Sequence, residues 1–319
     1  MKKIISMILA ITLMASLFVM PVVAEEPVFT DMPDDWTTSA LKNAVKNGLL
    51  NGYDGKIMPN DNIKRSEMAA ILVRAFGATK EADLSKFKDV PKDQWYYSEF
   101  AKAVEMKIFN GSDNGMMYPE NDITFQECFA VISRLVSLPN QEENRLGRYS
   151  DIKSVDDWAK QSVANVIFGG YWEVKGGKIR PQEYITRAEF AVLMDNLIKT
   201  YITEPGTYNT LPEGNTVIKA ANVVIDGVKT DDMIIVSDGI AGDVKFINMD
   251  MEGTVLARGG NVTVEGNVYR LLAPTTYVSL NSAKWVKTPV ITNYYQDKKA
   301  AMTITMDDGY YKSALIYDR

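Results

Sequence analysis

The stretch Ile185-Thr186-Arg187-Ala188-Glu189 indicates how the first half of this chain folds, because related stretches occur twice more. They are Ile63-Lys64-Arg65-Ser66-Glu67 and Ile123-Thr124-Phe125-Gln126-Glu127. Thr-x-x-Glu is a capping box, in which the Thr side chain accepts a bond from the backbone N–H three residues later and the Glu side chain bonds back. Apolar residues follow at spacings of three and four, as over residues 68–75, which predicts an amphipathic helix after each stretch.

A threefold repeat with a period of about 60 residues surrounds these stretches. In each copy an aromatic residue and an Asp come first, a Trp follows, and a helical pattern then leads through a Gly-rich loop and a Pro to the second helix. We place the copies at residues 27–80, 85–140 and 147–202. The shared acids are Asp31, Asp89 and Asp151, and the shared tryptophans are Trp36, Trp95 and Trp158.

Arg65 and Arg187 lie in the first turn of their helices, where the helix dipole disfavours a cation. One explanation is an anion site, in which the guanidinium and the free backbone N–H groups of the helix start hold a negative charge. A solvated Arg or a salt bridge between repeats explains the residue equally well. Phe125 occupies this place in the second copy, so we expect no cation there. Lys64 replaces the capping Thr in the first copy, so that helix start is expected to be less well capped.

The composition excludes several kinds of chemistry. The chain has no His, which excludes Ser-His-Asp and Cys-His catalysis and His-ligated zinc. Its single Cys excludes an internal disulfide and a Cys-cluster zinc site, and the helical pattern makes Cys128 a core residue. A formal net charge of −6 over 319 residues argues against a general nucleic-acid binder. We therefore expect no cofactor, no metal and no nucleic-acid partner.

Residues 1–24 have the pattern of a secretory signal peptide. Lys2 and Lys3 precede the apolar run 4–23, and small residues ending at Ala24 precede two acids. A membrane anchor is the alternative, because about 20 apolar residues can span a bilayer. We favour cleavage, since the small residues and the acids follow the run at once. The mature protein is then expected outside the cytoplasmic membrane, with no membrane span.

The three copies resemble S-layer homology domains, whose mark is an Ile-Thr-Arg-Ala-Glu-like motif that residues 185–189 match letter for letter. This resemblance covers about residues 27–202. It implies a compact pseudo-threefold unit around a central three-helix bundle, with grooves between the repeats. It also implies that these grooves bind a secondary cell-wall polysaccharide attached to peptidoglycan, often through pyruvylated sugars.

The resemblance assigns the motif Arg to the pyruvyl carboxylate, a role that falls to Arg65 and Arg187. The groove that starts at Phe125 is then expected to be weak or silent. Aromatic residues stack on the sugar in this family, and a core role for the aromatic residues is equally plausible here. The acids line the grooves or cap turns. The residues in question are Trp36, Trp95 and Trp158, and Asp31, Asp89 and Asp151.

The second half of the chain has a different pattern. Residues 203–290 contain short β-rich runs every 9–12 residues, separated by Gly, Asn and Asp, as in Gly259-Gly260-Asn261. Such spacing fits a short parallel β-helix or a small sandwich, and we favour the β-helix. The fold class is therefore multidomain α+β, with a helical pseudo-threefold unit followed by a β-rich segment.

Residues 291–319 resemble the first motif of polysaccharide deacetylases at Thr305-Met306-Asp307-Asp308-Gly309. The family would use Asp307 as a base and Asp308 as a metal ligand. Its metal site also needs two His, and the chain has none, so we expect no such activity. The match is either an ordinary turn signal or the front of a longer enzyme, and residues 313–317 look like the start of a helix.

Our leading interpretation is a secreted, non-catalytic protein held at the cell wall by three S-layer homology domains. The alternatives are a truncated wall-anchored polysaccharide deacetylase and a structural S-layer subunit.

Overall fold

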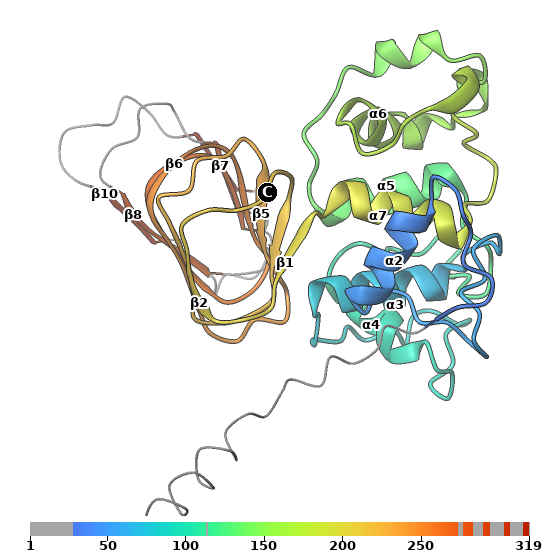
Figure 1. Ribbon diagram of the computed structural model, residues 1–319, viewed down its shortest axis with the longest axis horizontal. Coiled ribbons are helices and arrows are strands. Elements are labelled where there is room, and N and C mark those ends of the chain that lie inside the picture. Colours follow the sequence, from blue (N-terminus) through green and yellow to red (C-terminus); the bar gives the residue numbers. More distant parts are fainter. Residues whose placement is uncertain are drawn as a thin grey trace, which may run out of the picture.

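The computed structural model describes residues 28–112, 114–273, 277–282, 290–293, 303–306 and 315–318. It consists of a helical unit and a β-solenoid that lie side by side (Figure 1). The predicted signal peptide, together with Asp307 and Asp308, lies outside the described residues. In the part of the chain that is described, no helix has the length and apolar character needed to cross a membrane.

Each repeat contributes two α-helices to the helical unit. The first helices are α2 (Thr38–Lys46), α4 (Tyr97–Glu105) and α6 (Lys160–Phe168). The second helices are α3 (Arg65–Phe76), α5 (Phe125–Leu135) and α7 (Arg187–Leu197). The short 3-10 helices are η1 (Glu143–Arg148), η2 (Ile152–Ser154), η3 (Asp157–Ala159) and η4 (Lys175–Gly177). The first helices bury one face, whereas the second helices are buried over most of their length. The first helix of each repeat packs on the second helix of the preceding one, in the cycle α4 on α3, α6 on α5 and α2 on α7.

A closed ring of backbone hydrogen bonds joins the three repeats. The N–H of Ile123 donates to the carbonyl of Ile63 (3.1 Å), that of Ile185 to Ile123 (3.1 Å), and that of Ile63 to Ile185 (3.0 Å). All three side chains are fully buried. Such a ring forms only when three equivalent segments surround one axis, so it confirms the pseudo-threefold arrangement expected from the repeat.

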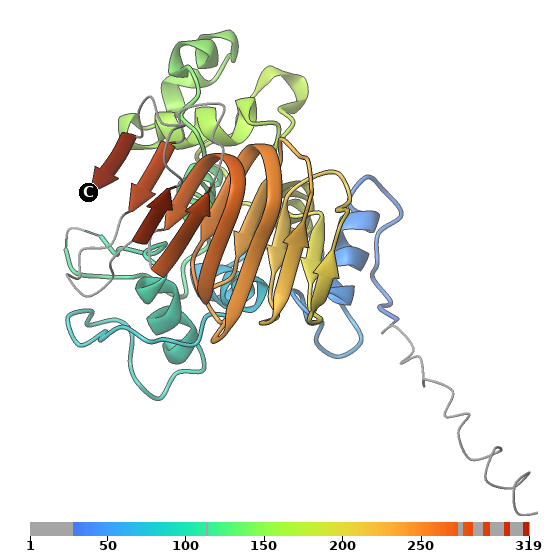
Figure 2. The same cartoon turned by 90° about the vertical axis from the view of Figure 1, so that its left-hand side faces the viewer.

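The second half is a parallel β-solenoid, and Figure 2 shows its face that is turned away from the helical unit. Its strands are β1 (Thr200–Ile202), β2 (Gly206–Tyr208), β3 (Thr216–Ile218), β4 (Val223–Asp226), β5 (Met233–Val236), β6 (Asp243–Ala257), β7 (Asn261–Ala273), β8 (Tyr277–Ser282), β9 (Val290–Asn293), β10 (Thr303–Met306) and β11 (Leu315–Asp318). One face contains β1, β3, β5, the second halves of β6 and β7, and β9, and the other face contains β2, β4, the first halves of β6 and β7, and β8. Every pairing among these strands is parallel, which confirms the β-helix and excludes the sandwich, whose sheets are antiparallel.

The last described strands continue the two faces. Thr303–Met306 pairs in parallel with β8, and Leu315–Asp318 pairs in parallel with β9. The expectation of a helix start at residues 313–317 was therefore wrong at Leu315, Ile316 and Tyr317, which lie in a strand. A short run of consecutive apolar residues suits either structure, and the neighbouring strand decides which one forms.

The apolar core of the helical unit extends onto one face of the solenoid, which also has an apolar core of its own. In β3, β5 and β6, alternate side chains point in opposite directions, so Ile218 and Val236 fill the solenoid whereas Val217, Ile235 and Leu256 pack on the helices. β3, β5 and the end of β6 are buried on both sides, which explains their nearly continuous apolar sequence.

Polar side chains of the solenoid cap the ends of the three second helices. Lys219 Nζ donates to the carbonyl of Arg74 in the last turn of α3 (2.8 Å), Arg258 Nη1 to that of Leu135 at the end of α5 (3.0 Å), and Asn215 Nδ2 to that of Leu197 at the end of α7 (2.9 Å). The last carbonyls of a helix have no partner within it, and the helix dipole favours cations there. Side chains of the solenoid thus provide hydrogen-bond donors for carbonyls at the C-terminal ends of all three helices of the bundle.

Candidate functional site

The candidate site lies where the start of each second helix meets the next repeat. We call these places the first, second and third junctions. They are centred on the helix starts at Arg65, Phe125 and Arg187, which face repeats 2, 3 and 1 respectively. All three are at the end of the bundle opposite the solenoid, because α7 begins at Arg187 and leads after Leu197 directly into β1 (Figure 1).

At the third junction, Arg187 crosses into repeat 1. Its Nε donates to the carbonyl of Ile57 (3.0 Å), its Nη2 to that of Asn51 (3.3 Å), and its Nη1 pairs with Glu67 Oε1 (3.5 Å). Only 8% of the side chain is exposed. Arg187 therefore forms a salt bridge between repeats, which was one of the explanations left open by the sequence.

Arg65 makes the matching contacts at the first junction. Its Nε donates to the carbonyl of Met117 (2.9 Å), and its Nη1 pairs with Glu127 Oε1 (3.2 Å). The guanidinium lies 5.4 Å from the centre of the Phe109 ring. Burial lowers the pKa of Arg65, and the carboxylate of Glu127 opposes that shift. The group remains a cation, since arginine does not lose its proton in proteins.

The backbone N–H groups of the helix starts are already bonded. At the third junction, the N–H of Arg187 donates to the carbonyl of Asp61 (2.9 Å) and that of Ala188 to the carbonyl of Pro59 (3.0 Å). The other two junctions repeat the pattern. The idea that free N–H groups hold an anion with the Arg was therefore wrong, because the next repeat supplies their acceptors.

The capping boxes form as the sequence predicts. Thr186 Oγ1 accepts from the N–H of Glu189 (3.2 Å), and Glu189 Oε2 accepts from the N–H of Thr186 (3.0 Å). At the first junction only the Glu67 half is present, with its Oε2 accepting from the N–H of Lys64 (3.0 Å). The Lys64 side chain bonds Glu120 instead (2.6 Å), which confirms the weaker cap.

The second junction has a cation from an unexpected place. Phe125 is fully buried, and its ring centre lies 5.3 Å from that of Trp172. Arg180, in the loop of repeat 3, lies 4.4 Å above the Phe125 ring and pairs with Glu189 Oε1 (2.5 Å). We expected no cation at this junction, and that expectation was wrong because of Arg180. The sequence did not point to Arg180, since the equivalent loop residues of the other repeats, Met58 and Tyr118, are uncharged.

The three acids that recur in the repeats, Asp31, Asp89 and Asp151, hold the loops of their own repeats. Asp31 accepts from the N–H groups of Ile57 (2.7 Å) and Met58 (2.8 Å). Asp89 and Asp151 bond the equivalent pairs, and the second residue of each pair has a positive φ. Burial acts to raise the pKa of Asp31, but the two N–H donors outweigh it and hold the pKa below its usual value. These acids act as turn caps, which was one of their two expected roles.

The three tryptophans are exposed. Trp36 is 52%, Trp95 61% and Trp158 58% exposed, so the alternative of a core aromatic was wrong. Trp36 also carries Lys175 Nζ at 3.3 Å from its ring centre, and its ring meets the edge of Trp172 at 6.4 Å. An exposed aromatic ring can stack on a sugar, and a cation beside the ring, such as Lys175 beside Trp36, can bind an acidic substituent of that sugar.

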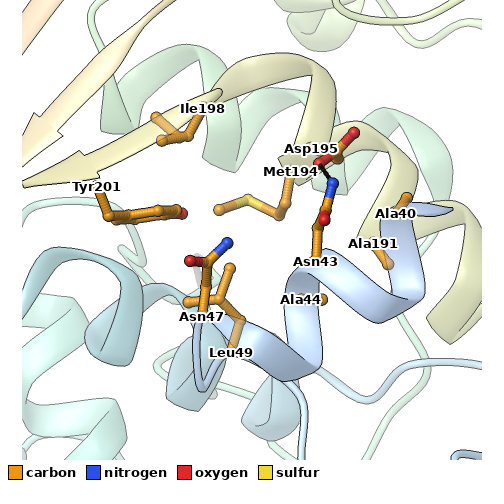
Figure 3. A pocket seen from close by; sticks show the side chains of 10 residues that line it. All are labelled: Ala40, Asn43, Ala44, Asn47, Leu49, Ala191, Met194, Asp195, Ile198 and Tyr201. Atoms are coloured by element: carbon orange, nitrogen blue, oxygen red, sulfur yellow. Dashed lines mark hydrogen bonds between the residues drawn. The ribbon is translucent and has the colours of Figure 1, made fainter. Parts of the chain in front are cut away.

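A small pocket of about 10 Å³ lies between α2, α7 and β1, with space for about one water (Figure 3). Asn43 Nδ2 donates to Asp195 Oδ1 across it (2.8 Å). The Tyr201 hydroxyl has no partner among the described residues, and burial raises its pKa. No sequence signal pointed to this pocket.

Other chemistry is not supported by the described residues. Cys128 is fully buried, as expected of a core residue, and burial raises the pKa of its thiol well above the usual value. Within the described ranges, no group of three or more acids or Cys is placed to hold a metal ion.

Comparison with known proteins gives similarities confined to part of the chain. Residues 28–69, 86–127 and 148–191 match the S-layer homology domain. The "Surface-layer 125 kDa protein" of Lysinibacillus sphaericus is 30% identical over 175 residues, which are 53% of this chain and 15% of that protein. The "Exoglucanase XynX" of Acetivibrio thermocellus is 27% identical over 56% of this chain and 17% of its own length. The "Cellulosome-anchoring protein" of the same organism is 26% identical over 47% of this chain and 35% of its length.

Proposed function

We propose that this chain, whose residues 28–69, 86–127 and 148–191 match the S-layer homology domain, is held at the cell surface by binding of its three repeats to a wall polysaccharide. The observation that carries the proposal is the match of all three repeats, which also form the closed ring of a single rigid unit. The family and its surface-layer relatives place the protein outside the cell. The matched stretches are about half of this chain and about a third or less of these relatives' own lengths.

The ligand we propose is a secondary cell-wall polysaccharide attached to peptidoglycan, with acidic substituents such as pyruvyl groups. An exposed Trp in each repeat and a guanidinium at each junction support this class of ligand, and Arg180 is the most exposed of the three guanidinium groups. The Trp rings provide a flat apolar surface for a sugar ring, and a guanidinium binds a carboxylate at two points. Three sites on one body also favour a repeating polymer, since the second and third contacts are intramolecular.

The proposed role is non-catalytic. Enzymes occur among the relatives, such as the exoglucanase, but the match covers only 17% of that protein's own length. The junctions and the solenoid are at opposite ends of the bundle, so wall binding leaves the solenoid facing away from the polymer. We infer that the solenoid is the part of this chain that is presented from the wall.

Binding of the protein to purified walls tests the proposal. Walls that retain the polysaccharide should sediment the full chain, and walls from which hydrofluoric acid has removed the polymer should not. Equal sedimentation with both walls would contradict the proposal.

A structural S-layer subunit is the second candidate, and the similarity to a surface-layer protein favours it. Self-assembly into sheets after removal of denaturant, seen by electron microscopy without added wall, would support that role. Chains that stay monomeric in light scattering would exclude it.

A further inference from the structure

Every capping-box glutamate is paired with a guanidinium, although only two repeats have the motif Arg. The oxygen Oε2 of each Glu accepts from the first residue of its own box, and Oε1 faces the cation. The pairs are Glu67 with Arg187 (3.5 Å), Glu127 with Arg65 (3.2 Å) and Glu189 with Arg180 (2.5 Å). Arg180 thus supplies at the second junction the charge that the motif Arg supplies elsewhere, and it does so from a different backbone position.

Arg180 is held in this place by its backbone and by the contact of its side chain with Phe125. Its φ is +61°, and its N–H donates to Asp151 Oδ2 (2.8 Å). The guanidinium lies over the ring of Phe125, which stands where the other repeats have Arg. An Arg at position 125 would meet the guanidinium of Arg180, so Phe125 and Arg180 fit each other as a pair.

Arg180 is also the most accessible of the three cations. Its side chain is 35% exposed, compared with 13% for Arg65 and 8% for Arg187. The two buried guanidinium groups are also bonded to backbone carbonyls, whereas Arg180 contacts the carboxylates Glu189 and Glu183. The contact with Glu183 is loose, at 3.6 Å, and Glu183 is 62% exposed. An exposed pair of this kind is weak, so a ligand carboxylate can replace Glu183.

We propose that the second junction is a carboxylate-binding site in which Arg180 is the ligand-binding residue and Glu183 is a competing internal carboxylate. The ligand class is a sugar with a carboxylate substituent, carried on a wall polymer. This proposal rests on the proposed function and deepens it. It reverses the expectation from the sequence that the Phe125 junction is silent.

The test uses the full chain and wall fragments with and without their polysaccharide. Arg180→Met is the main variant, because Met58 occupies the equivalent place in repeat 1 and keeps an apolar stem over Phe125. Lys178→Met is the matched control, since Lys178 is exposed in the same loop and its loss changes the charge equally. We expect Arg180→Met to weaken binding about tenfold or more, as for loss of a charged hydrogen bond, and Lys178→Met to change it less than about twofold.

Two further variants keep the proposal testable if Arg180→Met disturbs the fold. Glu183→Gln removes the competing carboxylate from an exposed position and should strengthen binding a few-fold. The double variant Phe125→Arg/Arg180→Met moves the guanidinium to the motif position and should restore binding relative to Arg180→Met. Wild-type binding to intact walls, combined with no effect of Arg180→Met or Glu183→Gln, would overturn this inference alone. Failure of the wild type to distinguish intact from stripped walls would overturn the proposed function.

Discussion

Arg258 and Asp238 form a two-point ion pair beneath the helical bundle, with Nε–Oδ2 at 2.7 Å and Nη2–Oδ1 at 3.2 Å. The Arg258 side chain is 2% exposed, and its guanidinium also donates to the carbonyls of Leu135 (3.0 Å) and Met106 (2.9 Å). One residue of the solenoid therefore completes the ends of α5 and α4. The two halves of the molecule are coupled through this buried contact.

Removing Asp238 tests this coupling. Asp238→Asn leaves a buried cation with less compensation, so we expect a loss of about 3 kcal/mol in the free energy of unfolding. The loss should appear in a single transition of both the helical and the β signal in urea, followed by circular dichroism. Two separate transitions, with only the β signal affected, would show that the solenoid folds independently. Asp231→Asn, at an exposed solenoid position, is the control.

A close backbone contact at the same interface predicts a second effect. A Cβ at Gly239 would lie 1.8 Å from the carbonyl oxygen of Gly77, which no side-chain movement can relieve. Gly239→Ala should therefore destabilise the protein by about 1–3 kcal/mol, as in overpacked cores. Gly147→Ala is the matched control, since nothing lies within 4 Å of its Cβ. Equal midpoints in urea for the two variants would contradict this packing.

Substitutions at the exposed tryptophans should change wall binding without changing the stability of the fold. Trp95→Ala and Trp158→Ala should weaken wall binding several-fold each, because a stacked ring is lost, while the unfolding midpoint stays nearly constant. Tyr53→Ala provides an exposed aromatic control, since Tyr53 is 79% exposed and is not one of the repeated tryptophans. If the Tyr53 variant loses as much binding as the tryptophan variants, the stacking role is wrong.

The turn cap at Asp31 predicts a dependence of stability on pH. Its pKa in the folded protein lies below the ordinary value of 3.8, since two N–H donors bind the ionised form. The contribution of Asp31 to the free energy of unfolding is therefore complete above the pKa that this residue has in the unfolded chain. It is lost as the pH falls through the pKa that Asp31 has in the folded protein. Asp31→Asn should flatten the fall of the unfolding free energy below about pH 4, measured in urea at several pH values. Asp34→Asn, at an exposed neighbouring position, should keep the wild-type slope.

Much of the helical unit could be predicted from local patterns. Apolar spacing located the helices, and Thr186 and Glu189 form the capping box that their spacing indicated. Local patterns do not reveal the partners of groups that are far apart in the chain. For this reason the sequence suggested free N–H groups beside Arg187, whereas Pro59 and Asp61 accept from them across 120 residues or more. The same limit concealed Arg180, whose charge matters only because the fold places it over Phe125.

The sequence by itself determined the threefold repeat, the start of each second helix and the change to short β-runs, although the first strand begins at Thr200, before the predicted boundary at residue 202. These features depend on neighbouring residues, through helix caps, apolar periodicity and turn residues. Only the tertiary structure decided that the solenoid caps the bundle through Asn215, Lys219 and Arg258, and that the cation of the second junction comes from Arg180. Those contacts join residues far apart in the chain, and their energy depends on burial and distance, which exist only after the chain has folded.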